Sequence, residues 1–179
     1  MGPGSGAACD ITLNTSLTDD ERARWQDPDV IRRILRQTRT VAIVGLSTDP
    51  QKASVFVAAY LQHEGYRVVP VTPRSGTLLG ERTWPDLASV PEPIDLVVPF
   101  RPSHDCVELA RQAVVIRAKA FWLQLRLLNR EAAEIAGAAG LDVVMDKCVK
   151  MEHGRFMGGL HFAGMNTELV SARRRGRVT

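Results

Sequence analysis

Five short apolar runs, rich in β-branched residues and separated by helix-length segments, constrain the fold of this chain more than any other feature. The runs cover residues 41–44, 67–71, 94–98, 118–123 and 141–145. The predicted helices between them cover residues 53–64, 103–116 and 130–139. Runs that are apolar on both faces indicate strands covered by helices on both sides, and the alternation of strand and helix indicates parallel pairing. The sequence therefore predicts an α/β fold, a doubly wound, mostly parallel five-stranded sheet that is Rossmann-like, over about residues 40–146.

Two further helices are predicted before the first strand. Thr18, followed three residues later by Glu21, has the spacing of a capping box. Asp27 and Pro28 mark a second start, because Asp caps helices and Pro is favoured at the first helical position. The inward-facing residues of this second helix are expected to be Val30, Ile31, Ile34 and Leu35. We expect the two helices to form an N-terminal helical brace on the sheet, and the proline-containing connection 72–93 to be mostly loop.

The length and charge of the chain indicate one domain with a neutral body. The 179 residues are predicted to form a flexible N-terminus (1–16), a single domain (17–170) and a basic C-terminal tail (171–179). Lys and Arg total 23 and Asp and Glu total 20, a net charge of +3. Four arginines lie in the last seven residues, and without them 19 cations face 20 anions, a charge of −1. A near-neutral body disfavours nucleic acid as a partner.

The sequence also predicts a soluble, cytoplasmic protein. No segment approaches the roughly 18 consecutive apolar residues of a membrane span, and residues 1–16 lack the pattern of a secretory signal. Cys9, Cys106 and Cys148 are odd in number and far apart, which favours reduced thiols over a disulfide framework or a metal site. We expect Cys106, on a predicted helix, to be buried as a small hydrophobic residue.

The segment after the first run has the features of an anion-binding turn. Ligands of an open parallel sheet bind beyond the carboxyl ends of its strands. Gly45 permits a tight turn and close backbone approach, and the amides at the start of the next helix favour an anion. Leu46 continues the turn, while Ser47, Lys52 and Ser54 add polar donors. The segment fits a diphosphate, although it is neither a G-x-G-x-x-G nor a Walker loop. The alternative is a capped turn with a solvated lysine.

An arginine follows the second run, in the sequence Thr72-Pro73-Arg74. A site for NAD normally has Asp or Glu here, to accept hydrogen bonds from the ribose hydroxyls. A guanidinium instead matches a phosphate on the ribose, which indicates coenzyme A or NADP rather than NAD. The alternative is a surface arginine in a proline-containing turn.

The ends of the third and fourth runs add further candidates. Pro99, Phe100 and Arg101 follow the third run, where the ring suits an adenine or pantetheine group and the guanidinium suits a phosphate. Gln124 follows the fourth run, and its amide has the reach to bond an amide of pantetheine. The alternative for this position is a surface glutamine beside a core tryptophan.

In their order along the chain, these motifs resemble the small stand-alone CoA-binding proteins of bacteria and archaea. The likeness covers roughly residues 30–175 and rests on residues 41–47, 65–71, 79–80, 100–101, 122–124, 129–133, 139–141, 143–148 and 152–155. Residues 71–73, 79–80 and 98–100 are also similar to the CoA-binding domain of the succinyl-CoA synthetase alpha subunit. The resemblance implies CoA contacts from Gly45, Leu46, Ser47, Lys52, Thr72, Pro73, Arg74, Pro99, Phe100, Arg101 and Gln124. Arg117 and Arg126 stand where this family commonly has Gly, and Thr72 stands where many members have Asn.

The sequence shows no catalytic constellation. Catalysis requires a nucleophile with a base, a carboxylate pair or a metal cluster, so we predict no catalytic residue and no metal site. We interpret Asp146 and Lys147 as an ion pair, and His153 as a structural or surface residue.

These observations favour a protein that binds coenzyme A or a short acyl-CoA without catalysis of its own, as a carrier, a sensor or the partner of an acyltransferase. One alternative is an NADP-binding oxidoreductase or redox sensor. Another is the CoA-binding subunit of an acyl-CoA ligase, which requires an ATP-grasp partner.

Overall fold

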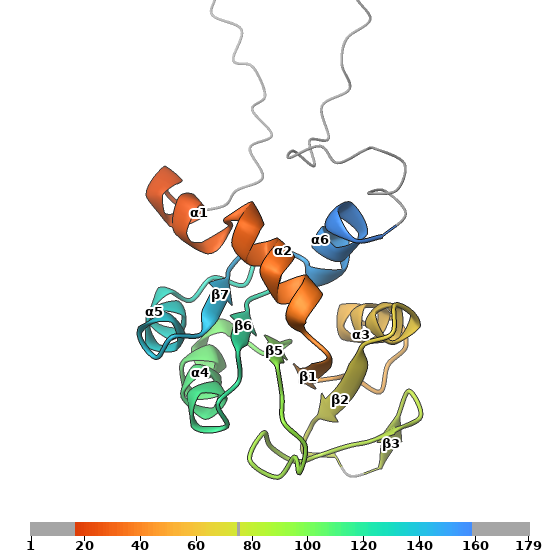
Figure 1. Ribbon diagram of the computed structural model, residues 1–179. Helices are drawn as coiled ribbons and strands as arrows, with labels where there is room; N and C mark the ends of the chain where they lie inside the picture. The colour runs from red at the N-terminus through yellow and green to blue at the C-terminus, as the bar shows by residue number, and fades with distance from the viewer. Residues whose placement is uncertain (1–16, 75, 159–179) are drawn as a thin grey trace, which may run out of the picture.

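A five-stranded parallel sheet, in the order β2-β1-β5-β6-β7, forms the centre of the computed structural model, which describes residues 17–74 and 76–158 (Figure 1). Its strands are β1 (Thr40–Val44), β2 (Arg67–Val71), β5 (Leu96–Pro99), β6 (Ala120–Trp122) and β7 (Asp142–Val144). Each strand overlaps one of the five predicted runs, and each adjacent pair is parallel. The predicted α/β, Rossmann-like fold is therefore confirmed.

Helices cover both faces of this sheet. They are α1 (Asp19–Trp25), α2 (Pro28–Gln37), α3 (Ala53–His63), α4 (Cys106–Val115), α5 (Arg130–Ala138) and α6 (Val149–Phe156), with a 3-10 turn η1 (Ser103–Asp105) before α4. Figure 1 shows α4 and α5 on one side, and α2, α3 and α6 on the other. Successive β1 residues enter opposite cores, because Ala42 packs with Phe121 whereas Ile43 packs with Trp122. The sheet is doubly wound, with a buried core on each face.

The strand order places a crevice at the carboxyl end of the sheet. β1 lies inside the sheet, and the chain leaves it for β2 on one side before returning to β5 on its other side. The strand order therefore reverses between β1 and β5, the position at which open α/β sheets bind ligands. The loops that follow β1, β2, β5 and β6 all begin at this end of the sheet.

The N-terminal helices form the predicted brace. The Thr18 hydroxyl and the Glu21 carboxylate make both hydrogen bonds of the capping box at the start of α1. Trp25 is buried in one core, and its carbonyl accepts the Met145 N–H at 3.1 Å. On α2, Ile31, Ile34 and Leu35 are buried as predicted, whereas Val30 is only half-buried.

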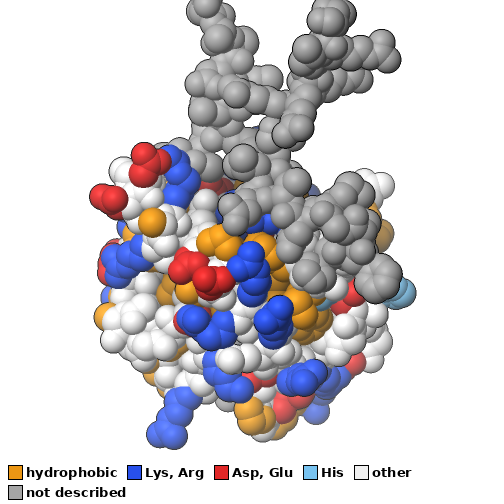
Figure 2. Space-filling view, turned by 45° about the horizontal axis from the view of Figure 1, so that its top comes forward, with side chains coloured by type: hydrophobic (Ala, Val, Ile, Leu, Met, Phe, Trp, Pro, Cys, Tyr) orange, Lys and Arg blue, Asp and Glu red, His pale blue; other side chains and the backbone are white. Residues whose placement is uncertain are grey.

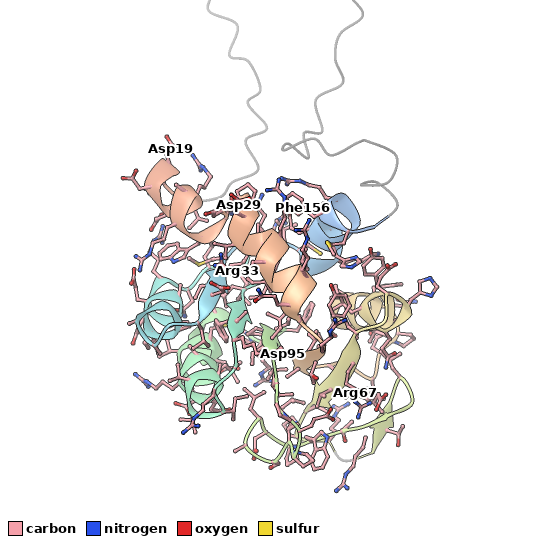
Figure 3. All side chains as sticks on the ribbon, in the orientation of Figure 1. Asp19, Asp29, Arg33, Arg67, Asp95 and Phe156 are labelled. Atoms are coloured by element: carbon pink, nitrogen blue, oxygen red, sulfur yellow. The ribbon has the colours of Figure 1, made fainter. Side chains whose placement is uncertain are left out.

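Ion pairs add to the contact between these helices and the sheet. The guanidinium of Arg33, labelled in Figure 3, lies 2.6 Å from the Asp142 carboxylate at the start of β7. Arg24 donates at 2.7 Å to Glu134 on α5. These ion pairs thus join α1 to α5 and α2 to β7.

The connection 72–93 is mostly loop, as predicted, and it contains one short hairpin of β3 (Thr77–Leu78) and β4 (Glu81–Arg82). One element differs from the sequence prediction. Helix α6 was not predicted, because its buried face carries Glu152, His153 and Arg155 among the apolar residues and hides the usual apolar periodicity.

Several predictions on the chain ends lie outside the described residues. These are the flexible N-terminus (1–16), the last part of the predicted domain (159–170) and the basic tail (171–179). Among the helices of residues 17–158, none is long and apolar enough to cross a membrane. On the face in Figure 2, basic and acidic side chains are interspersed rather than gathered in one basic patch.

Candidate functional site

The turn after β1 is enclosed by backbone from both neighbouring strands. Gly45 has a φ of +89°, and its N–H donates to the carbonyl of Val71 at 2.8 Å. A Cβ at this position would lie 2.7 Å from the carbonyl oxygen of Phe100 and 2.9 Å from Cδ of Arg101. Only glycine fits, because the backbone is left-handed and the loop after β5 approaches closely. The predicted tight turn at Gly45 is therefore present.

The rest of this turn is held by two serine hydroxyls. The Ser47 N–H donates to Oγ of Ser54 at 3.2 Å, and Oγ of Ser47 accepts the Asp49 N–H at 3.0 Å. Leu46 is buried in the core, so it offers the crevice only its backbone. Lys52 is the exposed N-cap residue of α3, and its side chain makes no capping hydrogen bond. The first turn of α3, which is described throughout, carries no acidic residue. This helix end is therefore suited to an anion.

Arg74 faces the same turn from the end of β2. Its Nη1 atom lies 3.3 Å from Oγ1 of Thr48, and its side chain is exposed. A cavity of about 320 Å³ lies between the two segments. It is lined by Gly45, Leu46, Ser47, Thr48, Thr72, Pro73, Arg74 and Arg101. The structure thus gathers the predicted turn, Thr72, Pro73, Arg74 and Arg101 around one space, which we name the first cavity.

A second, larger cavity of about 480 Å³ adjoins the first, since Arg101 lines both. It is lined by Ala53, Val57, Pro99, Phe100, Arg101, Pro102, Gln124, Leu125, Arg126, Leu127, Cys148 and Met151. Most of these side chains are apolar, so this second cavity suits a slender ligand with few charges. A ligand with a charged end and an uncharged arm fits the pair of cavities.

Gln124 is the polar group buried in the second cavity. It is 7% exposed, and its Oε1 accepts the Val149 N–H at 3.4 Å. Its Nε2 atom has no hydrogen-bond partner among the described residues. A buried amide nitrogen without an acceptor is costly, so a carbonyl on a ligand in this cavity would satisfy it.

The comparison with known families agrees with this geometry. Residues 39–154 match the family described as CoA binding domain. The chain belongs to this CoA-binding family. The match begins just before β1 and ends within α6, so it includes every described segment that lines the two cavities.

The match with individual relatives covers most of the described part of the chain. The Bacillus subtilis (strain 168) protein YneT is 35% identical over 123 residues, which are 69% of this chain and 91% of YneT. A solved structure from Pyrococcus horikoshii OT3 is 35% identical with a TM-score of 0.71, covering 73% of this chain and 92% of that one. A Thermus thermophilus structure is 32% identical with a TM-score of 0.70, covering 73% of this chain and 99% of that one.

Two arginines of this member of the family occupy backbone positions that favour glycine. Arg126 has a φ of +66° and Arg117 a φ of +56°, which explains in physical terms why glycine suits these positions. The Arg126 N–H donates to Oδ1 of Asp146 at 2.6 Å, and its exposed side chain borders the second cavity. Arg117 lines neither cavity.

Two predicted site residues lie beside the cavities rather than in their walls. Lys52 and Ser54 line neither cavity, and the Ser54 side chain is buried beneath the turn. Their contacts with a ligand stay predictions. The second cavity also contains residues that the sequence analysis did not single out, among them Cys148 and Met151. These residues lie at the start of α6. The sequence analysis missed them because it did not predict this helix.

The charged residues near α6 form ion pairs with one another. The ion pair predicted between Asp146 and Lys147 is wrong, since Nζ of Lys147 lies 3.9 Å from Oε1 of Glu152 instead. Glu152 also pairs with the buried Arg155 at 3.2 Å. No group of three or more His, Cys, Asp or Glu residues in the described part of the chain is arranged to hold a metal ion.

His153 has the structural position that the sequence analysis favoured. It is buried on α6, and its Nδ1 lies 3.0 Å from the Tyr60 hydroxyl. Its ring also packs edge-on against Tyr66. Burial lowers the pKa of His153, so the ring is neutral at neutral pH. It lines neither of the two cavities.

Proposed function

We propose that this protein binds coenzyme A or a short acyl-CoA, with the phosphates in the first cavity and the pantetheine arm in the second. Membership of the CoA-binding family supports the ligand class. The arrangement of the two cavities supports the orientation, because the first has the cationic and amide donors and the second has the apolar walls.

The observation that carries this proposal is the position of Arg74 against the turn after β1. Its guanidinium lies 3.3 Å from the Thr48 hydroxyl, so one phosphate-binding group stands against the turn that leads from β1 to α3. Coenzyme A carries a diphosphate and a separate phosphate on its ribose. A helix start suits the diphosphate, and a guanidinium suits the ribose phosphate.

Gln124 supports the placement of the pantetheine arm. Its Nε2 atom is a buried donor without a partner among the described residues. The arm contains two amide carbonyls along an otherwise apolar chain, and either one would accept this hydrogen bond. The half-buried ring of Phe100 provides an apolar surface in the same cavity.

We propose further that binding takes place without catalysis by this chain. The described residues that line the two cavities include no histidine, aspartate or glutamate. These walls therefore supply no imidazole or carboxylate to act as a general acid or base at the ligand.

Isothermal titration with coenzyme A, dephospho-CoA, NADP and NAD tests the proposal. We expect coenzyme A to bind more tightly than the other three. Arg74→Ala should weaken coenzyme A binding by about tenfold or more, the range of a charge-assisted hydrogen bond, and leave dephospho-CoA unchanged. Arg111→Ala on α4 is the matched control. Tighter binding of NADP, or equal binding of coenzyme A and dephospho-CoA, would overturn the proposal.

A further inference from the structure

A thiol and an unsatisfied amide line the same apolar cavity. Cys148 is half-buried, borders the second cavity and is the N-cap residue of α6. Gln124, which is 7% exposed, accepts the N–H of Val149, the residue next to that cysteine. The Nε2 atom of Gln124 has no partner within the described chain. The cysteine therefore stands beside a buried donor that a ligand in this cavity would satisfy.

The neighbouring cavity determines which part of a ligand reaches the thiol. Arg101 lines both cavities, so a ligand whose phosphates occupy the first extends its arm into the second. Phe100 and Cys148 both pack against the core beneath the second cavity. The far end of a pantetheine arm carries sulfur, and it would enter the cavity that Cys148 borders.

We propose that Cys148 is a site of thiol–disulfide exchange with CoA disulfides, at which the protein captures coenzyme A as a mixed disulfide. This inference rests on the proposed function. One half of the CoA disulfide is bound in the two cavities, and the Cys148 thiolate attacks its sulfur atom. A new S–S bond forms between Cys148 and this half, and the original S–S bond to the second CoA half breaks. The second thiol leaves as a thiolate and takes up a proton in place of the one that Cys148 lost. The protein sulfur is oxidised and the leaving sulfur is reduced, so no further oxidant is needed.

The environment of the other described cysteine favours Cys148 as the reacting residue. Cys106 is buried, its Sγ lies 3.7 Å from the carbonyl of Pro102, and it lines neither cavity. Burial raises the pKa of the Cys106 thiol to about 11, which leaves little thiolate at neutral pH. Cys148 instead is half-buried at the N-cap position of α6 and lines the second cavity, so a ligand in that cavity can reach it.

The test uses the full chain with Cys9→Ser, because Cys9 lies outside the described residues. The protein is incubated with CoA disulfide and followed by intact mass and peptide mapping. We expect one CoA per chain, attached to Cys148 and released by dithiothreitol. The added variant Cys148→Ser should form no adduct, and its urea unfolding should match that of its parent, which shows that it is folded. Cys106→Ser should react like its parent.

Two comparisons separate directed capture from general thiol reactivity. Pantetheine disulfide carries the same reactive end without the nucleotide, and we expect it to react at least tenfold more slowly. An excess of desulfo-CoA, which has no thiol, should slow the reaction with CoA disulfide to a similar extent. If the protein binds coenzyme A but forms no adduct, or reacts equally with both disulfides, the inference fails and the proposed function stands. If coenzyme A does not bind, both fail.

Discussion

The carboxylate of Asp95 accepts the backbone N–H of Arg39 at 2.8 Å and so joins the amino ends of two central strands. The same oxygen accepts the Thr40 N–H at 3.1 Å, and the other oxygen lies 2.7 Å from Nζ of Lys119. Asp95, labelled in Figure 3, therefore contacts the chain just before β1 and just before β6. It holds the strands at the end of the sheet opposite the two cavities.

Asp95→Asn should destabilise the protein in a pH-dependent way. Burial acts to raise the pKa of Asp95, but hydrogen bonds from Lys119, Arg39 and Thr40 outweigh it and hold the pKa below its ordinary value of 3.8. Because the pKa is lower in the folded state, the stabilisation is present above the unfolded pKa and is lost as the pH falls through the folded one. We expect a loss of about 1–3 kcal/mol in the free energy of unfolding at pH 7.

Urea unfolding at pH 7 and at pH 3 measures this effect. The difference between the parent protein and Asp95→Asn should shrink at the lower pH. Asp20→Asn, at an exposed carboxylate on α1, should change the free energy of unfolding by no more than about 0.5 kcal/mol. An equal difference at both pH values would show that the charge of Asp95 contributes nothing.

Gly45→Ala should cost more stability than an alanine at another left-handed glycine. At Gly45 the new methyl group would meet the Phe100 carbonyl at 2.7 Å, whereas at Gly140, with a φ of +87°, nothing lies within 4 Å of it. Alanine in a left-handed backbone conformation is strained in both variants, but only at Gly45 does its methyl group also clash with the Phe100 carbonyl oxygen. We expect a loss of about 2–4 kcal/mol for Gly45→Ala and about 1–2 kcal/mol for Gly140→Ala.

Thermal and urea unfolding of the two variants give this comparison directly. Coenzyme A titration adds a second measurement, because a displaced loop after β5 should weaken binding only in Gly45→Ala. Equal destabilisation of the two variants would mean that the loop moves aside without cost.

The sheet was predictable because its signal is local, whereas α6 depends on tertiary partners. A run such as residues 67–71 is apolar on both faces and needs no partner to be recognised as a buried strand. The buried face of α6 instead contains Glu152, Arg155 and His153, whose burial is offset by an ion pair at 3.2 Å and by the Tyr60 hydroxyl at 3.0 Å. Sequence periodicity carries no sign of those contacts.

The site residues also fall into those that follow predicted strands and those that depend on the placement of α6. Gly45, Arg74 and Phe100 follow predicted strands, so the sheet topology alone brings them to one crevice. Cys148 and Met151 reach the second cavity only through the placement of α6. Residues 148–151 therefore form a wall of the cavity that strand positions could not predict.

Replacing either left-handed arginine by glycine should stabilise the protein. Arg126 and Arg117 both have positive φ angles, a conformation that costs a non-glycine residue roughly 1–2 kcal/mol. Glycine relieves this strain but loses more entropy on folding, so we expect a net gain of about 0.5–1 kcal/mol for Arg126→Gly and for Arg117→Gly. Calorimetric melting of both variants measures the gain, and unchanged or lower melting temperatures would contradict it.

Gln124→Leu should separate the two ends of the proposed ligand. Leucine removes the unsatisfied Nε2 donor and loses only one long hydrogen bond, from Val149 at 3.4 Å, so the free energy of unfolding should change by no more than about 1 kcal/mol. Coenzyme A should bind up to about tenfold more weakly, the value of one neutral hydrogen bond. Adenosine 3′,5′-bisphosphate, which has the 3′-phosphate and one 5′-phosphate but no pantetheine arm, should bind to the variant as it does to the parent. Gln112→Leu on α4 is the matched control, since its side chain contacts Glu108 and lines neither cavity. An equal loss for both ligands would indicate that Gln124 supports the fold of the site, and no loss for either would place the pantetheine arm elsewhere.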